Sequence, residues 1–192
     1  MTGTKSFGRP LLAFVVLASL LPMASAQEKI APEAYTGVAI GTGGSLGGKS
    51  IGFDFRITSY TTDEEVQTFA QLLKDKGQDP LTSALNKENK GSINLAGSTG
   101  NNIAIARKRQ QGDKTIITLV TARRMSFGEL YNGRRSANYP YSFIQVTLDA
   151  AGKGDGKIMV AAQIRFDKKS GQYEIESFGN QYIRAANVRP NK

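Results

Sequence analysis

Apolar residues at every second position mark most of the chain from residue 92 onward, and this pattern constrains the fold more than any other feature. The longest example consists of Ile158, Val160, Ala162, Ile164 and Phe166. A period of two is typical of a half-buried β-strand. The connections between these segments are short, which favours antiparallel pairing because parallel strands need a long crossover. The sequence therefore predicts an antiparallel meander over its C-terminal half.

The expected strands share this alternation and lie between turn residues. They cover residues 35–40, 51–57, 93–95, 103–110, 115–122, 144–148, 158–166 and 173–175. The fourth and fifth should form a hairpin, and Gly112 suits either a two-residue turn or a three-residue loop with a bulge. These two turns give different registers, and a slip of one residue would exchange the faces of the strand.

Between the second and third expected strands, the spacing of apolar residues changes to that of a helix. Thr62 and Glu65 form a capping box, and Gly77 is placed to end the helix in a left-handed conformation. A second, short helix is predicted after it, with Asp79 as the N-cap and Pro80 as the first helical residue. We expect an α+β fold: a curved, mainly antiparallel sheet of about eight strands with one inserted helix pair. Closure of the sheet into a barrel stays open at this point.

The N-terminus has the pattern of a secretory signal peptide. Lys5 and Arg9 precede an uncharged apolar run from Leu11 to Leu21, and an A-x-A pattern ends at Ala26. The run is shorter than the roughly 20 residues that a membrane-spanning helix needs. We therefore expect cleavage after Ala26, a single exported domain over residues 27–192 that is secreted or periplasmic, and no transmembrane segment after cleavage.

The chain contains neither Cys nor His. These absences exclude Ser-His-Asp and Cys-His nucleophiles, thiolate redox centres and zinc sites built from imidazole and thiolate. Asp149 and Asp155 lie among glycines but lack the ligand spacing of a calcium loop. The sequence therefore predicts no metal site and no cofactor.

Residues 43–50 match the phosphate-binding expression G-x-x-x-x-G-K-S. In that motif Lys and Ser open a helix, so that its first amides face the phosphates. Here Lys49 and Ser50 precede the alternating residues 51–57, which predict a strand. We therefore interpret the glycine-rich segment as a hairpin loop and expect no bound nucleotide.

Basic residues outnumber acidic ones by 25 to 16, and many lie in short clusters at 107–109, 123–124, 134–135 and 168–169. The clusters would attract an anionic partner, although a solvated basic surface that aids solubility is the alternative. No nucleic-acid motif accompanies the charge, so nucleic acid is not an expected partner.

The connection from Met125 to Tyr141 is unusually long for a loop between two strands, which is typical of functional loops. Its aromatic and polar side chains suit a ligand with a sugar or another amphipathic group. The candidate ligand-binding residues are Tyr131, Arg134, Arg135 and Tyr139. Glu129 is the only candidate for a catalytic acid or base. The alternative is that the aromatic residues simply cover one end of the sheet.

These observations favour an exported, non-enzymatic binding or envelope-associated module for an anionic or saccharide ligand. Two alternatives remain: a carboxylate-dependent hydrolase of an extracellular polymer that uses Glu129, and a purely structural envelope protein. The sequence carries no indication of oligomeric state.

Overall fold

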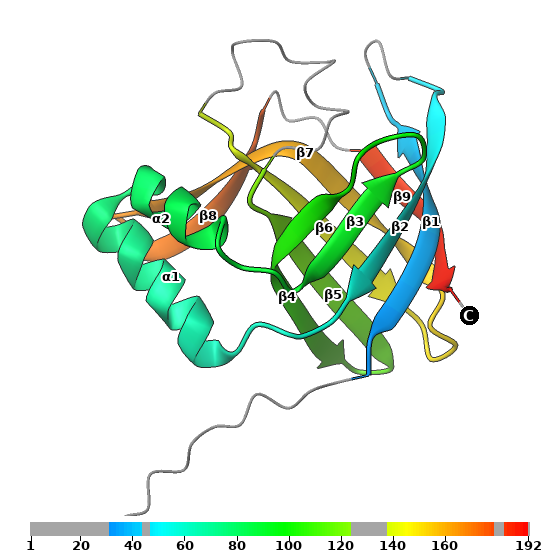
Figure 1. The fold of residues 1–192 in the computed structure, drawn as a ribbon, viewed down its shortest axis with the longest axis horizontal. Coiled ribbons are helices and arrows are strands. Elements are labelled where there is room, and N and C mark those ends of the chain that lie inside the picture. Colours follow the sequence, from blue (N-terminus) through cyan, green and yellow to red (C-terminus); the bar gives the residue numbers. More distant parts are fainter. Residues whose placement is uncertain (1–30, 44–46, 124–137, 179–182, 192) are drawn as a thin grey trace, which may run out of the picture.

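The computed structural model describes residues 31–43, 47–123, 138–178 and 183–191. It consists of a closed antiparallel barrel of eight strands, one additional strand and two helices on the outside of the barrel (Figure 1). The predicted α+β class, with a curved antiparallel sheet and an inserted helix pair, is confirmed. The proposed signal peptide, residues 1–26, lies outside the described residues.

The elements follow the chain in an order close to the expected one. They are β1 Glu33–Gly41, β2 Ser50–Ile57, α1 Asp63–Lys76, α2 Gln78–Leu85, β3 Gly91–Leu95, β4 Asn101–Gln111, β5 Lys114–Thr121, β6 Tyr141–Leu148, β7 Gly154–Asp167, β8 Gln172–Ser177 and β9 Ile183–Pro190. Neither helix is long and apolar enough to cross a membrane, and this finding applies to the described part of the chain.

Strand β9, which the sequence analysis did not predict, closes the barrel. The strand order is β6-β5-β4-β3-β2-β1-β9-β7-β8, and β6 also pairs with β7. Thus β9 lies between β1 and β7 and completes the ring of strands. Its alternation is weak because two of its buried residues are adjacent alanines, Ala185 and Ala186, and because Asn187 interrupts the ladder with a φ of +54°. Alanine is depleted in strands, so the pattern carries little signal.

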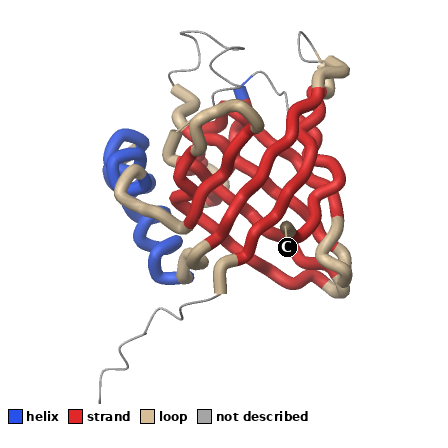
Figure 2. The backbone as a smooth tube through the Cα atoms, turned by 45° about the vertical axis from the view of Figure 1, so that its right-hand side comes forward, coloured by secondary structure: helices blue, strands red, loops and turns tan. Residues whose placement is uncertain are grey.

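Strand β7 belongs to the barrel along its first part only. Residues from Gly154 to Ala162 pair with β6, and Gly154 to Ile158 also pair with β9. From Ala162 to Asp167 the strand pairs with β8. The β7–β8 hairpin therefore extends past the barrel toward the helices, which lie on one side of it (Figures 1 and 2).

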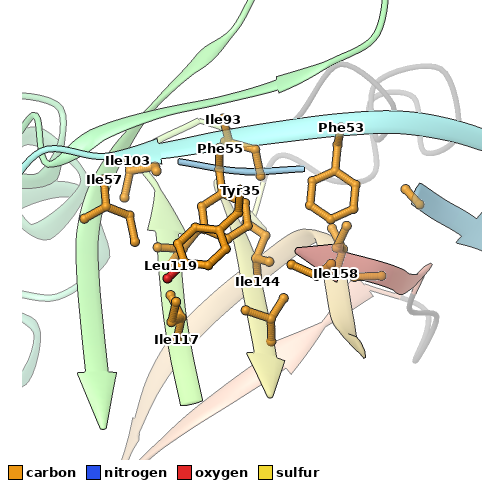
Figure 3. Close-up of a cluster of buried hydrophobic side chains, with 14 of the residues drawn as sticks. Tyr35, Phe53, Phe55, Ile57, Ile93, Ile103, Ile117, Leu119, Ile144 and Ile158 are labelled. Carbon is orange, nitrogen blue, oxygen red and sulfur yellow. The ribbon is translucent and has the colours of Figure 1, made fainter. Parts of the chain in front are cut away.

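Apolar side chains fill the interior of the barrel (Figure 3). Tyr35 and Phe55 stack with ring centroids 4.9 Å apart, and both are buried. Phe53 lies over its cross-strand partner Gly37, where an added Cβ would lie 2.8 Å from the ring. The glycine therefore makes room for an aromatic ring of the core.

A second apolar cluster joins the helices to the outer face of the barrel. Its buried residues are Phe69, Leu73, Leu81, Leu85, Ala104, Val120, Ala122 and Tyr141. The capping box is confirmed, because Thr62 Oγ1 accepts from the amide of Glu65 and Glu65 Oε2 accepts from the amide of Thr62. Val66, which continues the apolar stripe, is 36% exposed.

The predicted start of the second helix is wrong by two residues. Helix α2 begins at Gln78 with Gly77 as its N-cap, and no side chain caps it. Gly77 therefore ends α1 and precedes α2 directly, with φ +84° and ψ −164°. The positive φ agrees with the expectation, but the ψ value lies outside the left-handed helical region, in a conformation that glycine adopts readily.

The hairpin between β4 and β5 resolves the two registers that the sequence left open. Gln111 pairs with Lys114, so Gly112 and Asp113 form a two-residue turn, and Gly112 has a φ of +63°. A bulge between Ile103 and Ile105 shifts the register of β4. As a result, Ile103 lies in the barrel interior and Ile105 packs against the helix cluster.

The glycine-rich motif lies in the hairpin between β1 and β2. The amide of Gly41 donates to the Lys49 carbonyl at 2.9 Å, and Ser50 is the first residue of β2. The strand predicted after the motif is therefore confirmed, and Lys49 and Ser50 do not open a helix.

Candidate functional site

The two ends of the long connection between β5 and β6 identify the candidate site. Glu129, Tyr131, Arg134 and Arg135 lie outside the described residues, which omit 124–137. Arg123 follows the end of β5 and is exposed, and Tyr139 lies two residues before the start of β6.

Tyr141, which the sequence analysis placed in this connection, belongs to the core. It is the first residue of β6 and is 1% exposed, and its hydroxyl forms a 2.8 Å hydrogen bond with Thr82 Oγ1 on α2. The connection therefore ends at Pro140, and Tyr141 takes no part in the candidate site.

A polar hollow of about 190 Å³ lies beside Arg123, and we call it the Arg123 hollow. It is lined by Asn86, Glu88, Gly100, Asn101, Asn102, Ala122 and Arg123. These residues come from the segment after α2, the turn between β3 and β4, the start of β4 and the two residues after β5. Three asparagines, one glutamate and one arginine therefore contribute to a lining in which Ala122 is the one apolar side chain.

Local contacts hold the walls of the Arg123 hollow. The hydroxyl of Thr121 donates to the Arg123 carbonyl and accepts from the amide of Ser142 at 3.1 Å, which fixes the end of β5. At Gly100 an added Cβ would lie 1.8 Å from Asn94 Oδ1, so no larger residue fits the turn as it stands.

A buried lysine supports the opposite wall. Lys90 is 4% exposed, and its ammonium donates to Glu65 Oε1 at 2.6 Å and lies 3.5 Å from Glu88 Oε2. Burial alone would raise the pKa of Glu65, but the hydrogen bonds from Lys90 and from the Thr62 amide outweigh it and lower the pKa below 4.5. The Glu65 carboxylate therefore caps α1. Through its bond to Lys90 it also anchors the segment that contains Glu88.

Tyr139 joins a second polar group on the other side of the connection. Its hydroxyl donates to Glu176 Oε1 at 2.7 Å, and its ring packs edge-to-face on Phe178 with centroids 5.3 Å apart. Glu176 Oε2 also accepts from Gln163 Nε2 at 2.9 Å and from Arg165 Nη1 at 3.0 Å. The β7–β8 hairpin thus fixes the aromatic residue next to β6.

The three donors keep Glu176 ionised. The hydrogen bond from Tyr139, followed by those from Arg165 and Gln163, lowers the pKa of this carboxyl below 4.5. The same bond to Glu176 is the largest cause of the raised pKa of Tyr139. A carboxylate with these properties is suited to anchoring the tyrosine and unsuited to donating a proton near neutral pH.

The basic cluster at residues 107–109 lies elsewhere. Arg107 donates to the Thr61 carbonyl at 2.7 Å and pairs with Asp63 at the start of α1. Arg109 lies two residues closer to the β4–β5 turn, on the same face. Arg123 lies at the opposite end of β5, as predicted, so these basic residues do not form one patch.

Arg123 was identified from the sequence as part of a basic cluster. Its neighbours in the Arg123 hollow and the partners of Tyr139 were not. Asn86, Asn101 and Asn102 lie in polar segments that resemble ordinary turns. They meet because the segment after α2 lies beside the start of β4, where the Lys90 amide donates to the Ile103 carbonyl at 2.7 Å. Glu176 and Arg165 are opposite in charge and lie on neighbouring strands, but their proximity depends on the β7–β8 hairpin. Within the described ranges, no group of three or more acidic side chains is placed to hold a metal ion.

Comparison of this chain with protein-family models, with curated proteins and with solved structures finds no match.

Proposed function

We propose that this protein is an exported binding module for an acidic saccharide, and that the Arg123 hollow holds one charged ring of that ligand. The observation that carries the proposal is that three asparagines and one arginine line a single small hollow. An amide side chain both donates and accepts hydrogen bonds, as a sugar hydroxyl does. A row of amides is therefore complementary to a ring that carries several hydroxyls.

The size of the hollow supports a small ligand group. Pockets for drug-sized molecules usually measure about 300–1,000 Å³. The Arg123 hollow, at about 190 Å³, falls below that range. Its volume suits a single sugar ring, with the rest of a longer chain outside the hollow.

The charges support an acidic ring. The Arg123 guanidinium can form two parallel hydrogen bonds to a carboxylate. Glu88, the carboxylate of the hollow, lies 3.5 Å from the ammonium of Lys90, which partly offsets its charge. Lys90 is also paired with Glu65, so Arg123 is the cation among the described lining residues that an acidic group would meet.

The described carboxylates near the connection support binding more than hydrolysis. Inverting and retaining glycosidases need one carboxylic acid whose raised pKa lets it protonate the leaving group. The pKa of Glu176 is lowered, first by its hydrogen bond to Tyr139. The hydrolase alternative rests on Glu129, which lies outside the described residues.

Isothermal titration calorimetry with tetragalacturonate and with neutral galactotetraose tests the proposal. We expect the acidic tetrasaccharide to bind more tightly, and we expect Arg123→Gln to weaken its binding by about tenfold or more, since one charge-assisted contact is lost. Asn102→Ala should weaken both sugars. Arg109→Gln removes an exposed cation at the other end of β4 and should leave binding unchanged.

Two results would contradict this function. The first is equal affinity of the Arg123→Gln and Arg109→Gln proteins for tetragalacturonate, which would indicate general attraction by a basic surface. The second is the absence of binding by either tetrasaccharide at millimolar concentration.

A further inference from the structure

The outer face of the β7–β9 ladder carries a group of cations far from the Arg123 hollow. Lys157 on β7 is the direct cross-strand partner of Arg184 on β9. Lys153 precedes β7, and Arg189 lies near the end of β9. We call these four residues the ladder cations. Strands β7 and β9 are neighbours in the barrel (Figure 1).

A hollow of about 450 Å³ lies at this face, at the end of the barrel where β6 ends and β7 begins, and we call it the ladder hollow. Its polar lining comes from Asp149, Lys153, Asp155, Asn187 and Arg189. Thr115, near the start of β5, pairs with Leu148 directly before Asp149, whereas Arg123 follows the end of β5. The two hollows therefore lie at opposite ends of the barrel.

Both carboxylates of the ladder hollow accept hydrogen bonds from other groups of the protein. Asp149 Oδ1 accepts from the amides of Ala151 and Lys153, each at 2.9 Å. Asp155 accepts from Arg184 Nη2 at 2.7 Å and from the Asn187 amide at 3.0 Å. The bond from Arg184, followed by the one from Asn187, lowers the pKa of Asp155 below 3.8.

Unlike the two carboxylates, the two cations that line the ladder hollow are not held by bonds to acidic side chains among the described residues. Among the residues that the structure describes, neither Lys153 nor Arg189 lies within ion-pair distance of a carboxylate. Both are exposed. An anion in the hollow would therefore find two uncommitted positive charges and the side-chain amide of Asn187.

Two features of the same face are unusual for a regular sheet. Asn187 has a φ of +54°, which within the described ranges is the only positive φ outside glycine. Lys157 and Arg184 are like charges in direct cross-strand positions, and the ion pair between Arg184 and Asp155 offsets their repulsion. Local departures of this kind concentrate at functional sites. Both lie on the ladder that borders the hollow.

We propose that the ladder hollow is an anion site for a phosphate or sulfate group, separate from the saccharide site. Lys153 supplies a compact positive charge, and Arg189 supplies a planar fork that matches two oxygens of a tetrahedral anion. The side-chain amide of Asn187 supplies a further donor. The group is either a free ion or part of a larger molecule such as a phospholipid headgroup.

Titration with inorganic phosphate, followed by amide chemical shifts in ¹⁵N-labelled protein, tests the site. We expect saturable shifts at Lys153, Gly154 and Asn187. The double variant Lys153→Gln/Arg189→Gln should weaken phosphate binding by about tenfold or more, and sulfate should compete. Arg56→Gln is the matched control, because Arg56 is exposed on the outer face of β2. It should leave the titration unchanged.

A second arm distinguishes the sources of the anion. The protein is sedimented with vesicles of phosphatidylcholine, with and without phosphatidylglycerol. Sedimentation only with phosphatidylglycerol, lost in the double variant, supports the site and assigns the phosphate to a headgroup. Saturable phosphate binding without sedimentation supports the site and assigns it to a soluble molecule.

Three results would overturn the proposal. They are phosphate-dependent shifts spread over all basic segments, equal phosphate affinity of the double variant and the wild type, and no saturation by phosphate. Each can occur whether or not tetragalacturonate binds at the Arg123 hollow, so the two proposals fail independently.

Discussion

Replacement of Glu65 by Gln tests how the fold supports the wall of the Arg123 hollow. Glutamine keeps an oxygen that can accept from the Thr62 amide, so the capping box survives. The other end of the new amide is an NH₂ group, which would face the ammonium of Lys90 where Oε1 now accepts at 2.6 Å. The substitution therefore removes the partner of a buried charge and leaves the helix cap intact.

The expected loss of stability follows from the burial of the pair. Removing one partner of a fully buried ion pair costs about 3–5 kcal/mol. Glu65 is 29% exposed, and Glu88 remains 3.5 Å from the ammonium, so we expect a smaller loss of about 2 kcal/mol. For a chain of this size that loss corresponds to a decrease in Tm of about 4–8 °C.

Urea and thermal unfolding, followed by circular dichroism, measure this loss. Glu64→Gln is the matched control, because Glu64 lies in the same first helical turn and is exposed; it should change the free energy of unfolding by less than about 0.5 kcal/mol. The double variant Glu65→Gln/Lys90→Met should be more stable than Glu65→Gln alone, because the buried charge is also removed. Equal stability of the two glutamine variants would refute the reasoning.

The pH dependence provides a further check on Glu65. Its pKa is lowered from 4.5 in the folded protein, because the bonds from Lys90 and Thr62 outweigh the opposing effect of burial. The folded state therefore binds fewer protons than the unfolded state, and the stabilisation is present above pH 4.5 and lost as the pH falls. The difference between wild type and Glu65→Gln should shrink below that pH.

Two other predictions concern the barrel interior and the anchor of the connection. Gly37→Val should destabilise the protein by about 2 kcal/mol or more, because its Cβ would lie 2.8 Å from the Phe53 ring; Gly52→Val, with its nearest contact at 3.9 Å, should be tolerated, and equal unfolding midpoints would contradict the packing. In carboxyl NMR titrations, Glu176 should titrate below 4.5, and Tyr139→Phe should raise its pKa because the largest cause of the shift is lost; an unchanged pKa would contradict the hydrogen bond.

The sequence predicted the fold well where apolar residues alternate strongly. The segment 158–166 and the capping box at Thr62 and Glu65 both lie in the expected elements. Strand β9 was missed because Ala185 and Ala186 bury little apolar area and Asn187 breaks the period. Since β9 joins β1 to β7, the closure of the barrel could not be predicted without it.

The candidate site was predictable only in part. Of the residues predicted in the 125–141 connection, Tyr139 is described, and it joins a polar network with Glu176. Tyr141 was placed wrongly because an aromatic residue at the end of a loop resembles one at the start of a strand. Asn101 and Asn102 carry no local signal, since their role depends on the β3–β4 register.

The most direct test of the account is to locate tetragalacturonate on the protein by chemical-shift mapping of backbone amides and asparagine side-chain amides. The account predicts that the largest shifts occur at Asn86, Asn101, Asn102 and Arg123, which line one hollow, and that the ladder hollow near Asp149 does not respond. Shifts that are centred on the ladder hollow, or that are spread evenly over the basic surface, would contradict it.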